Sequence, residues 1–212
     1  WNPATARAAC QTAREIGYDL IEVLIFDPAT LDVAATARAA REAGIGLRLG
    51  MALSKGSDIS APDPDEAARG EATVARCLEI AAELGTPAVS GITYAAFDSY
   101  AAAPTPAQRE QVAMALSRLD SRAGELGVKL GLEPVNRYES YMVNTLDQGA
   151  DLIRTAGGRN LFLHMDTFHM NIEEADIAAT IQRNAANLGY AHLADSAIAD
   201  AAARVTPVSF SS

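Results

Sequence analysis

Residues 106–133 read PAQREQVAMALSRLDSRAGELGVKLGLE, and this stretch decides the fold. Its first part, 106–126, mixes charged and apolar residues at helical spacing, and Gly127 follows where a helix end favours a left-handed residue. The mostly apolar run 128–132 then has the length and composition of a buried strand, and Glu133 stands at its end. The stretch therefore predicts a helix followed by a strand that carries a carboxylate at its carboxyl end.

The same helix-then-strand pattern recurs along the chain. Strands are expected at 19–25, 45–51, 87–92, 128–133, 161–166 and 190–194, and helices at 3–17, 30–43, 64–84, 106–126, 145–156 and 173–187, the last closed by Gly189. The strands are nearly all apolar, which indicates that both of their faces are covered. Repeated units of this kind predict an α/β fold with a parallel sheet wrapped in helices.

Six strands suggest most of a (β/α)8 TIM barrel, which needs eight. An open, doubly wound sheet is the alternative, but Phe26-Asp27-Pro28 follows the first strand where a Gly-rich phosphate loop would be expected. Residue 3 already opens a helix, so we expect one strand before Trp1 and another after His192, with the natural N-terminus missing. No linker divides the chain, and we expect one barrel domain over 1–196 and a tail of unassigned structure over 197–212.

The composition narrows the classes of function. The chain has 212 residues, 49% of them hydrophobic, and a net charge of -10, which disfavours nucleic acid as a partner. No apolar run reaches the roughly 18 residues of a membrane span, and no signal peptide is evident. Cys10 and Cys77 have no metal-site spacing around them and are read as buried, reduced thiols, which favours a cytoplasmic protein.

Three ionisable residues close three consecutive predicted strands and are therefore expected on one rim of the barrel. They are Glu133, Asp166 and His192. A buried, unpaired carboxylate costs several kcal/mol, and a shared divalent cation would remove that cost. Two carboxylates and one imidazole suit Mn²⁺, with Mg²⁺ or Co²⁺ as alternatives.

Each of these residues also has a purely structural interpretation. Glu133 could pair with Arg137, Asp166 could cap the turn at Thr167, and His192 could be a satisfied core histidine. Two further histidines lie nearby in the sequence. His164 has the inward parity of Asp166 but lies one layer deeper, so we expect it to fill the barrel. His169 is expected on a loop, facing the rim.

Residues 133–139 (EPVNRYE) resemble the strand-5 signature of the D-tagatose 3-epimerase and D-psicose (D-allulose) 3-epimerase family. Residues 166–174 (DTFHMNIEE) are similar to its strand-6 signature, and 192–196 (HLADS) to its strand-7 segment. The resemblance covers roughly residues 1–196 and implies a xylose isomerase-like TIM barrel.

The resemblance also implies roles for single residues. Glu133, Asp166 and His192 would be metal ligands, and Glu133 would also act as an acid/base group. Glu139 and His169 would hydrogen-bond the sugar substrate, and Asn136 and Arg137 would support the rim. Family members commonly form dimers or tetramers, so a homo-oligomer is expected.

The implied reaction inverts C3 of a ketose through a metal-stabilised enediolate. In the family a second metal-binding glutamate, on strand 8, completes the inversion, but no glutamate follows Glu174 in these 212 residues. Alternatives are an aldose–ketose or hydroxypyruvate isomerase of the same barrel group, a non-catalytic metal-binding remnant, and a nuclease of the same superfamily. The charge and the count of three histidines disfavour the nuclease.

Overall fold

The computed structural model describes residues 1–195 of the protein. Its elements are, in order, α1 (Pro3–Ile16), β1 (Leu20–Ile25), a 3₁₀ turn (Pro28–Thr30), α2 (Val33–Ala43), β2 (Gly46–Leu53), α3 (Pro64–Leu84), β3 (Ala88–Ala96), α4 (Pro106–Leu126), β4 (Lys129–Leu132), α5 (Leu146–Ala156), β5 (Leu161–Asp166), α6 (Thr167–Glu173), α7 (Ile177–Asn184), a 3₁₀ turn (Ala185–Asn187) and β6 (Leu188–His192). The predicted tail over 197–212 lies outside the described residues.

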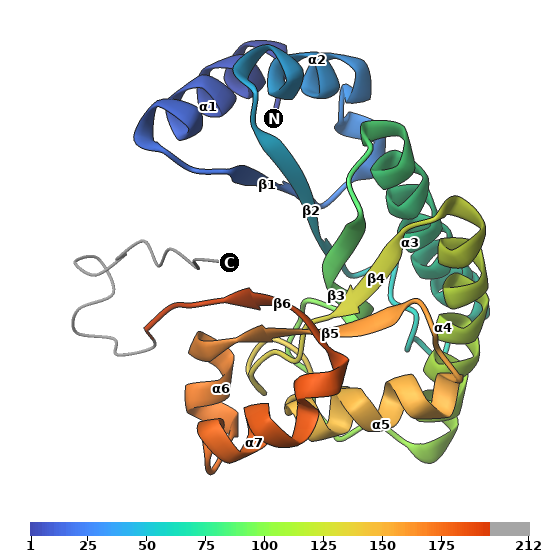
Figure 1. Ribbon diagram of the computed structural model, residues 1–212. Coiled ribbons are helices and arrows are strands. Elements are labelled where there is room, and N and C mark those ends of the chain that lie inside the picture. The colour runs from blue at the N-terminus through green and yellow to red at the C-terminus, as the bar shows by residue number, and fades with distance from the viewer. Residues whose placement is uncertain (196–212) are drawn as a thin grey trace.

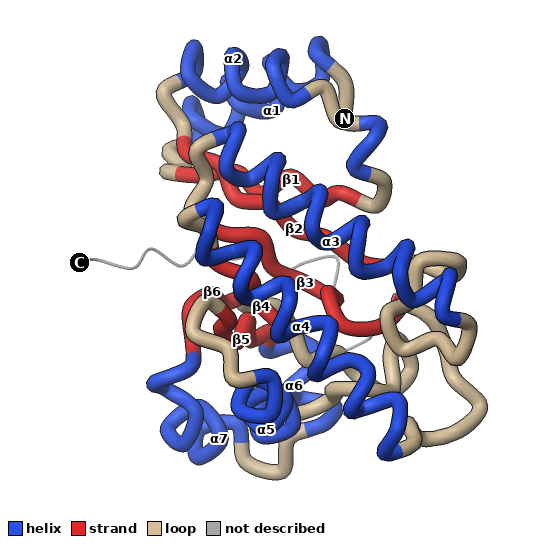
Figure 2. The backbone as a smooth tube through the Cα atoms, turned by 90° about the vertical axis from the view of Figure 1, so that its right-hand side faces the viewer, coloured by secondary structure: helices blue, strands red, loops and turns tan. Residues whose placement is uncertain are grey.

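The six strands form one parallel sheet in the order β1-β2-β3-β4-β5-β6. Figure 1 shows the sheet curling, with β1 and β6 at its two ends and the helices on its outer side. Figure 2 shows α3 and α4 running side by side over that outer face. Because every strand runs in the same direction, all carboxyl ends reach one rim. The predicted six-unit partial barrel is confirmed.

Local signals explain where the helices begin and end, as α4 illustrates. Thr105 and Gln108 form a reciprocal capping box around its first turn, and Pro106 occupies the first helical position. Gly127 ends it with φ 68°, a left-handed conformation that glycine adopts without a Cβ penalty. The turn is short, so β4 follows at once and Glu133 is carried to the rim.

Successive side chains of a strand point alternately toward the helices outside the sheet and toward the interior of the barrel. Leu130 and Leu132 are fully buried in the hydrophobic core beneath the helices. Gly131 points inward, where a Cβ would lie 2.5 Å from the Phe162 ring. Glu133 shares the parity of Gly131 and therefore also faces the interior.

Two predictions about the strands and helices near the C-terminus are wrong. The helix expected over 173–187 is the shorter α7, which begins only after the extended Glu174 and is capped by Asp176, and a separate helix, α6, occupies the residues before it where a loop was expected. Gly189 does not close a helix but lies in β6 against Phe162, where a larger residue would not fit. Helix α6 begins directly after β5 because the side chain of Asp166 caps it.

The prediction that both faces of every strand are covered fails at β1. Its side chains Leu20 and Leu24 are 42% and 54% exposed. β1 is an edge strand, and no strand pairs with its outer edge within residues 1–195. The β2 and β3 strands also run further than expected, to Leu53 and Ala96.

The sequence also led us to expect no membrane span, two buried and reduced cysteines, and one more strand at each end. Among residues 1–195, no helix has the combination of length and hydrophobicity needed to cross a bilayer. Cys10 and Cys77 are both buried and are not joined in a disulfide. The strands expected before Trp1 and after His192 stay predictions.

Candidate active site

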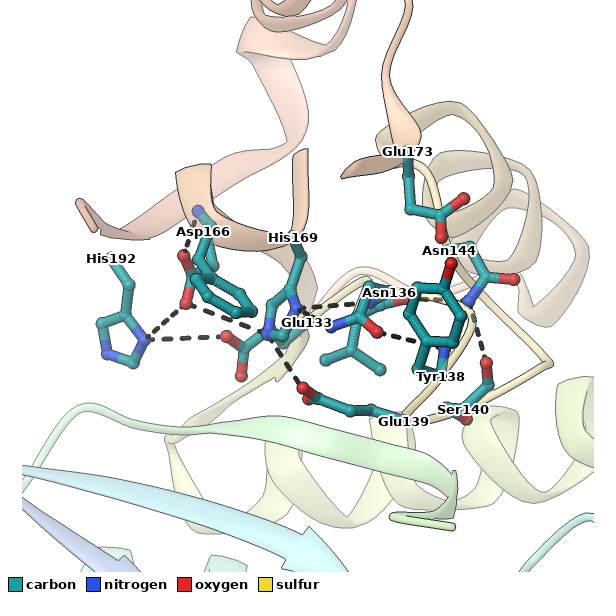
Figure 3. A network of polar contacts seen from close by, with 12 residues as sticks. Glu133, Asn136, Tyr138, Glu139, Ser140, Asn144, Asp166, His169, Glu173 and His192 are labelled. Atoms are coloured by element: carbon teal, nitrogen blue, oxygen red, sulfur yellow. Dashed lines mark hydrogen bonds and ion pairs between the residues drawn. The ribbon is translucent and has the colours of Figure 1, made fainter. Parts of the chain in front are cut away.

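The three predicted metal ligands meet at the carboxyl-end rim of the sheet. Glu133 directly follows β4, Asp166 is the last residue of β5, and His192 is the last residue of β6. Nδ1 of His192 lies 3.6 Å from Glu133 Oε1 and 3.7 Å from Asp166 Oδ2. Figure 3 shows the three side chains pointing toward one another. Their role as ligands stays a prediction.

The spacing of these atoms suits a shared cation. Hydrogen-bonded nitrogen and oxygen atoms are usually about 2.7–3.2 Å apart, so these contacts are long. Two ligands of one ion, each about 2.1 Å away, can be separated by up to about 4.2 Å. The donor atoms also lie within 4.8 Å of one another inside each of two overlapping sets, which share Glu133 and divide Asp166 and His192 between them: Glu133 with His164 and His192, and Glu133 with Asp166 and His169. The distances from His192 Nδ1 to Glu133 and to Asp166 are therefore compatible with pairs of ligands of one divalent ion.

The electrostatics point to the same requirement for positive charge. Burial lowers the pKa of His192, but the neighbouring carboxylates of Asp166, Glu133 and Glu22 outweigh it and raise that pKa to about 12. Without a metal, the imidazole therefore holds a proton among three carboxylates. The three carboxylates therefore favour a positive charge at this position.

The two carboxylate oxygens of Asp166 make different contacts. Its Oδ1 accepts a hydrogen bond from the backbone N–H of Phe168 at 2.7 Å and caps α6. Its Oδ2 faces His192 and lies 3.9 Å from Nε2 of His169. The structural interpretation of Asp166 as a cap is therefore correct, and it leaves one oxygen free for the site.

His169 lies on α6, so its predicted placement on a loop is wrong. It is 8% exposed, and its Nδ1 accepts a hydrogen bond from the backbone N–H of Asn136 at 3.2 Å. Because a backbone N–H can only donate, the neutral ring carries its proton on Nε2. Nε2 lies 3.9 Å from both Glu139 Oε2 and Asp166 Oδ2, so this donor faces the space between the two carboxylates.

Arg137 does not pair with Glu133. Its side chain forms two hydrogen bonds with the carboxylate of Glu173, at 2.9 and 2.8 Å, and its backbone N–H donates a third at 2.7 Å. The Arg137 guanidinium lowers the pKa of Glu173 against the opposing effect of burial. The pair ties the loop after β4 to α6, which excludes the ion-pair interpretation of Glu133.

His164 lies beneath the rim and is fully buried. Burial lowers its pKa well below 6.5, so the ring is neutral. Its ring stands edge-on to His192 at 4.2 Å, and its Nδ1 is 3.6 Å from Glu133 Oε2. Within residues 1–195 neither ring nitrogen has a hydrogen-bond partner. This burial agrees with the expected interior position of His164.

Glu22 on β1 was not among the predicted site residues. Its Oε2 accepts hydrogen bonds from Tyr190 Oη at 2.8 Å and from His192 Nε2 at 2.9 Å. One signal was available, because Glu22 is the only charged residue in the apolar strand Leu20–Ile25. A lone carboxylate in such a strand requires a polar partner inside the fold.

Comparison with known proteins identifies the family. The model of the xylose isomerase-like TIM barrel family matches residues 10–210. The chain belongs to this family. The predicted fold class and family resemblance are thus confirmed.

Within the xylose isomerase-like barrels, the similar proteins are ketose 3-epimerases. An L-ribulose 3-epimerase of Mesorhizobium japonicum is 38% identical over 200 residues, which are 92% of this chain and 67% of that protein. A ketose 3-epimerase of Arthrobacter globiformis is 36% identical, over 90% of this chain and 66% of that protein. The crystal structure of a D-allulose 3-epimerase from Methylomonas sp. in complex with D-allulose matches with TM-score 0.90 and 33% identity, covering 92% of this chain and 68% of that one. The chain thus spans about two thirds of the length of these relatives.

Proposed function

We propose that this chain carries the catalytic centre of a metal-dependent ketose 3-epimerase. The observation that carries the proposal is the meeting of Glu133, Asp166 and His192 at one rim, with His192 Nδ1 3.6 and 3.7 Å from the two carboxylates. The similarity to L-ribulose and ketose 3-epimerases supports the reaction class.

Glu133, Asp166 and His192 would hold the cation, with Mn²⁺ favoured over Mg²⁺ and Co²⁺ by the mixed carboxylate and imidazole donors. A bound dication supplies Lewis-acid stabilisation of the negative charge that develops on the substrate oxygens. The carboxylate-rich rim, which raises the pKa of His192 to about 12, provides the electrostatic reason for a cation there.

Proton transfer and substrate binding are assigned to three residues of the chain. Glu133 takes the proton from C3 of the ketose, the C–H electron pair forms the C2–C3 double bond, and the carbonyl pair moves to the C2 oxygen. The Nε2–H of His169 would donate to a sugar oxygen. The carboxylate of Glu139, 3.9 Å from that nitrogen and 30% exposed, would accept from a sugar hydroxyl.

Proton exchange in heavy water tests the proposal directly. Residues 1–212 are incubated with Mn²⁺ and D-fructose, and deuterium at C3 is followed by NMR. Since Glu133 is the single strand-end glutamate found here, we expect deuterium at C3 with little inverted product. Glu133→Gln is the matched control, and it should abolish exchange.

The outcomes separate the parts of the proposal. Absence of exchange in a protein that binds Mn²⁺, or equal exchange by Glu133→Gln, would contradict the catalytic role. Efficient formation of the C3 epimer would support the reaction class and show that a second acid exists within these residues.

A further inference from the structure

The carboxylate of Glu22 joins the two ends of the sheet. Glu22 lies on β1 and His192 on β6, the two edge strands, and they are 170 positions apart in the sequence. The Glu22 Oε2 to His192 Nε2 distance is 2.9 Å, within the range of a direct hydrogen bond. The Glu22 and His192 side chains are 21% and 37% exposed, so this contact is partly shielded from solvent.

The contact determines which nitrogen of His192 faces the metal site. A carboxylate oxygen can only accept, so Nε2 carries the proton. In the neutral ring the lone pair then lies on Nδ1, the atom that faces Glu133 and Asp166. Metal-binding histidines commonly donate their other ring N–H to a carboxylate, which fixes ring orientation and increases ligand basicity.

Neighbouring residues hold this carboxylate in place. Tyr190 donates a hydrogen bond to the same oxygen of Glu22 at 2.8 Å. The Arg48 guanidinium lies over the Tyr190 ring, 4.9 Å from its centroid. Gly50, on the adjacent strand, leaves the space that Glu22 occupies, because a Cβ at position 50 would overlap the Glu22 carboxylate. The fold thus reserves room for this side chain.

We infer that Glu22 is a positioning residue for the metal centre, orienting His192 through its Nε2–H. This inference rests on the proposed function, because it requires His192 to be a metal ligand. Glu22 itself does not touch the substrate or the metal in this assignment.

The first test compares Mn²⁺ affinities by calorimetry. Glu22→Ala should weaken Mn²⁺ binding by about 10–100-fold, the usual effect of losing such an outer partner. Glu22→Gln should fall between Glu22→Ala and the unmodified protein, since its amide oxygen can still accept from Nε2. Glu42→Gln, which removes one charge from an exposed ion pair with Arg7, controls for net charge and should bind normally.

A second variant leaves every polar group in place. Gly50→Ala adds one methyl group that must displace the Glu22 carboxylate, and it should also weaken Mn²⁺ binding. In the Glu22→Ala background the same change should have almost no effect, because nothing remains to displace. This double-mutant cycle separates the loss of the contact from general damage to the sheet.

A spectroscopic readout distinguishes positioning from simple stabilisation. In the Co²⁺-loaded protein, the Nε2–H proton of a coordinated His192 should give a hyperfine-shifted, solvent-protected NMR signal. At saturating Co²⁺, Glu22→Ala should lose this signal to solvent exchange although the metal remains bound. The thermal unfolding of each metal-free variant shows in parallel whether the fold is intact.

Unchanged Mn²⁺ affinity in Glu22→Ala, with the protected signal retained, would overturn the inference and leave the proposed function standing. Absence of Mn²⁺ binding by the unmodified protein would overturn both. A loss of affinity in Gly50→Ala that persists in the Glu22→Ala background would also count against positioning by Glu22.

Discussion

The backbone N–H of Asn136 donates a hydrogen bond to Nδ1 of His169 at 3.2 Å. The contact links the loop after β4 to helix α6 and leaves the Nε2–H of His169 toward Glu139 and Asp166. The side-chain Nδ2 of Asn136 lies 2.9 Å from the same ring nitrogen, so both the backbone and the side chain of Asn136 orient the His169 ring.

Replacing His169 should therefore harm turnover more than metal binding. His169→Leu keeps the buried volume close to that of the imidazole but removes the Nε2–H donor. We expect C3 exchange to fall by about 10²-fold, typical of losing one catalytic hydrogen-bond donor. Calorimetry should find Mn²⁺ affinity nearly unchanged, and a large loss of affinity would instead place His169 among the ligands.

Two substitutions at Asp166 should separate its two roles. Asn caps helices about as well as Asp, so Asp166→Asn should retain the bond from Phe168 N–H and fold normally. Asp166→Ala should be less stable than Asp166→Asn by about 1 kcal/mol, the usual cost of losing a cap. Both should lose most Mn²⁺ affinity, measured beside chemical unfolding. Equal stability of the two variants would contradict the capping role.

The metal-free protein should lose stability as the pH rises above neutrality. The pKa of His192 is raised from 6.5 to about 12, so its contribution is complete below about pH 6.5 and declines as the pH rises toward 12. We would measure the free energy of unfolding between about pH 7 and 9, where few other side chains titrate. Over this range it should fall more steeply with pH in the unmodified protein than in His192→Gln. Parallel curves for the two proteins would contradict the raised pKa.

Gly131 should tolerate no side chain. A Cβ there would lie 2.5 Å from both the Phe162 ring and the Ser90 Cβ in the barrel interior. Gly131→Ala should lower the free energy of unfolding by about 1–3 kcal/mol, the usual cost of overpacking. Gly131→Ala combined with Phe162→Leu should recover part of the loss, and an additive effect would show that the two positions do not meet.

Much of this architecture could be predicted because its signals are local. The run before Glu133 and the Gly127 helix end lie within a few residues of each other, so the sequence places that carboxylate at a strand end. The same holds for Asp166 after the apolar start of β5. Parallel strands then bring both residues to the same rim without further information.

The missed features depend on contacts that are distant in sequence or on residues with two roles. Glu22 meets His192 only because the sheet curls and brings β1 toward β6, and no local pattern encodes that curvature. The helix boundary near His169 was misplaced because Asp166 both ends β5 and caps α6. Asp176, which caps α7, was a readable signal for the break that the helical spacing concealed.

The most direct test of the central claim is calorimetric titration of Mn²⁺ into residues 1–212 and into two histidine variants. We expect a single site in the unmodified protein. We also expect a loss of affinity of more than about 100-fold in His192→Leu, beyond the usual effect of outer partners, and near-normal binding in His164→Leu. Binding by His192→Leu equal to that of the unmodified protein, or no binding by the unmodified protein, would contradict it.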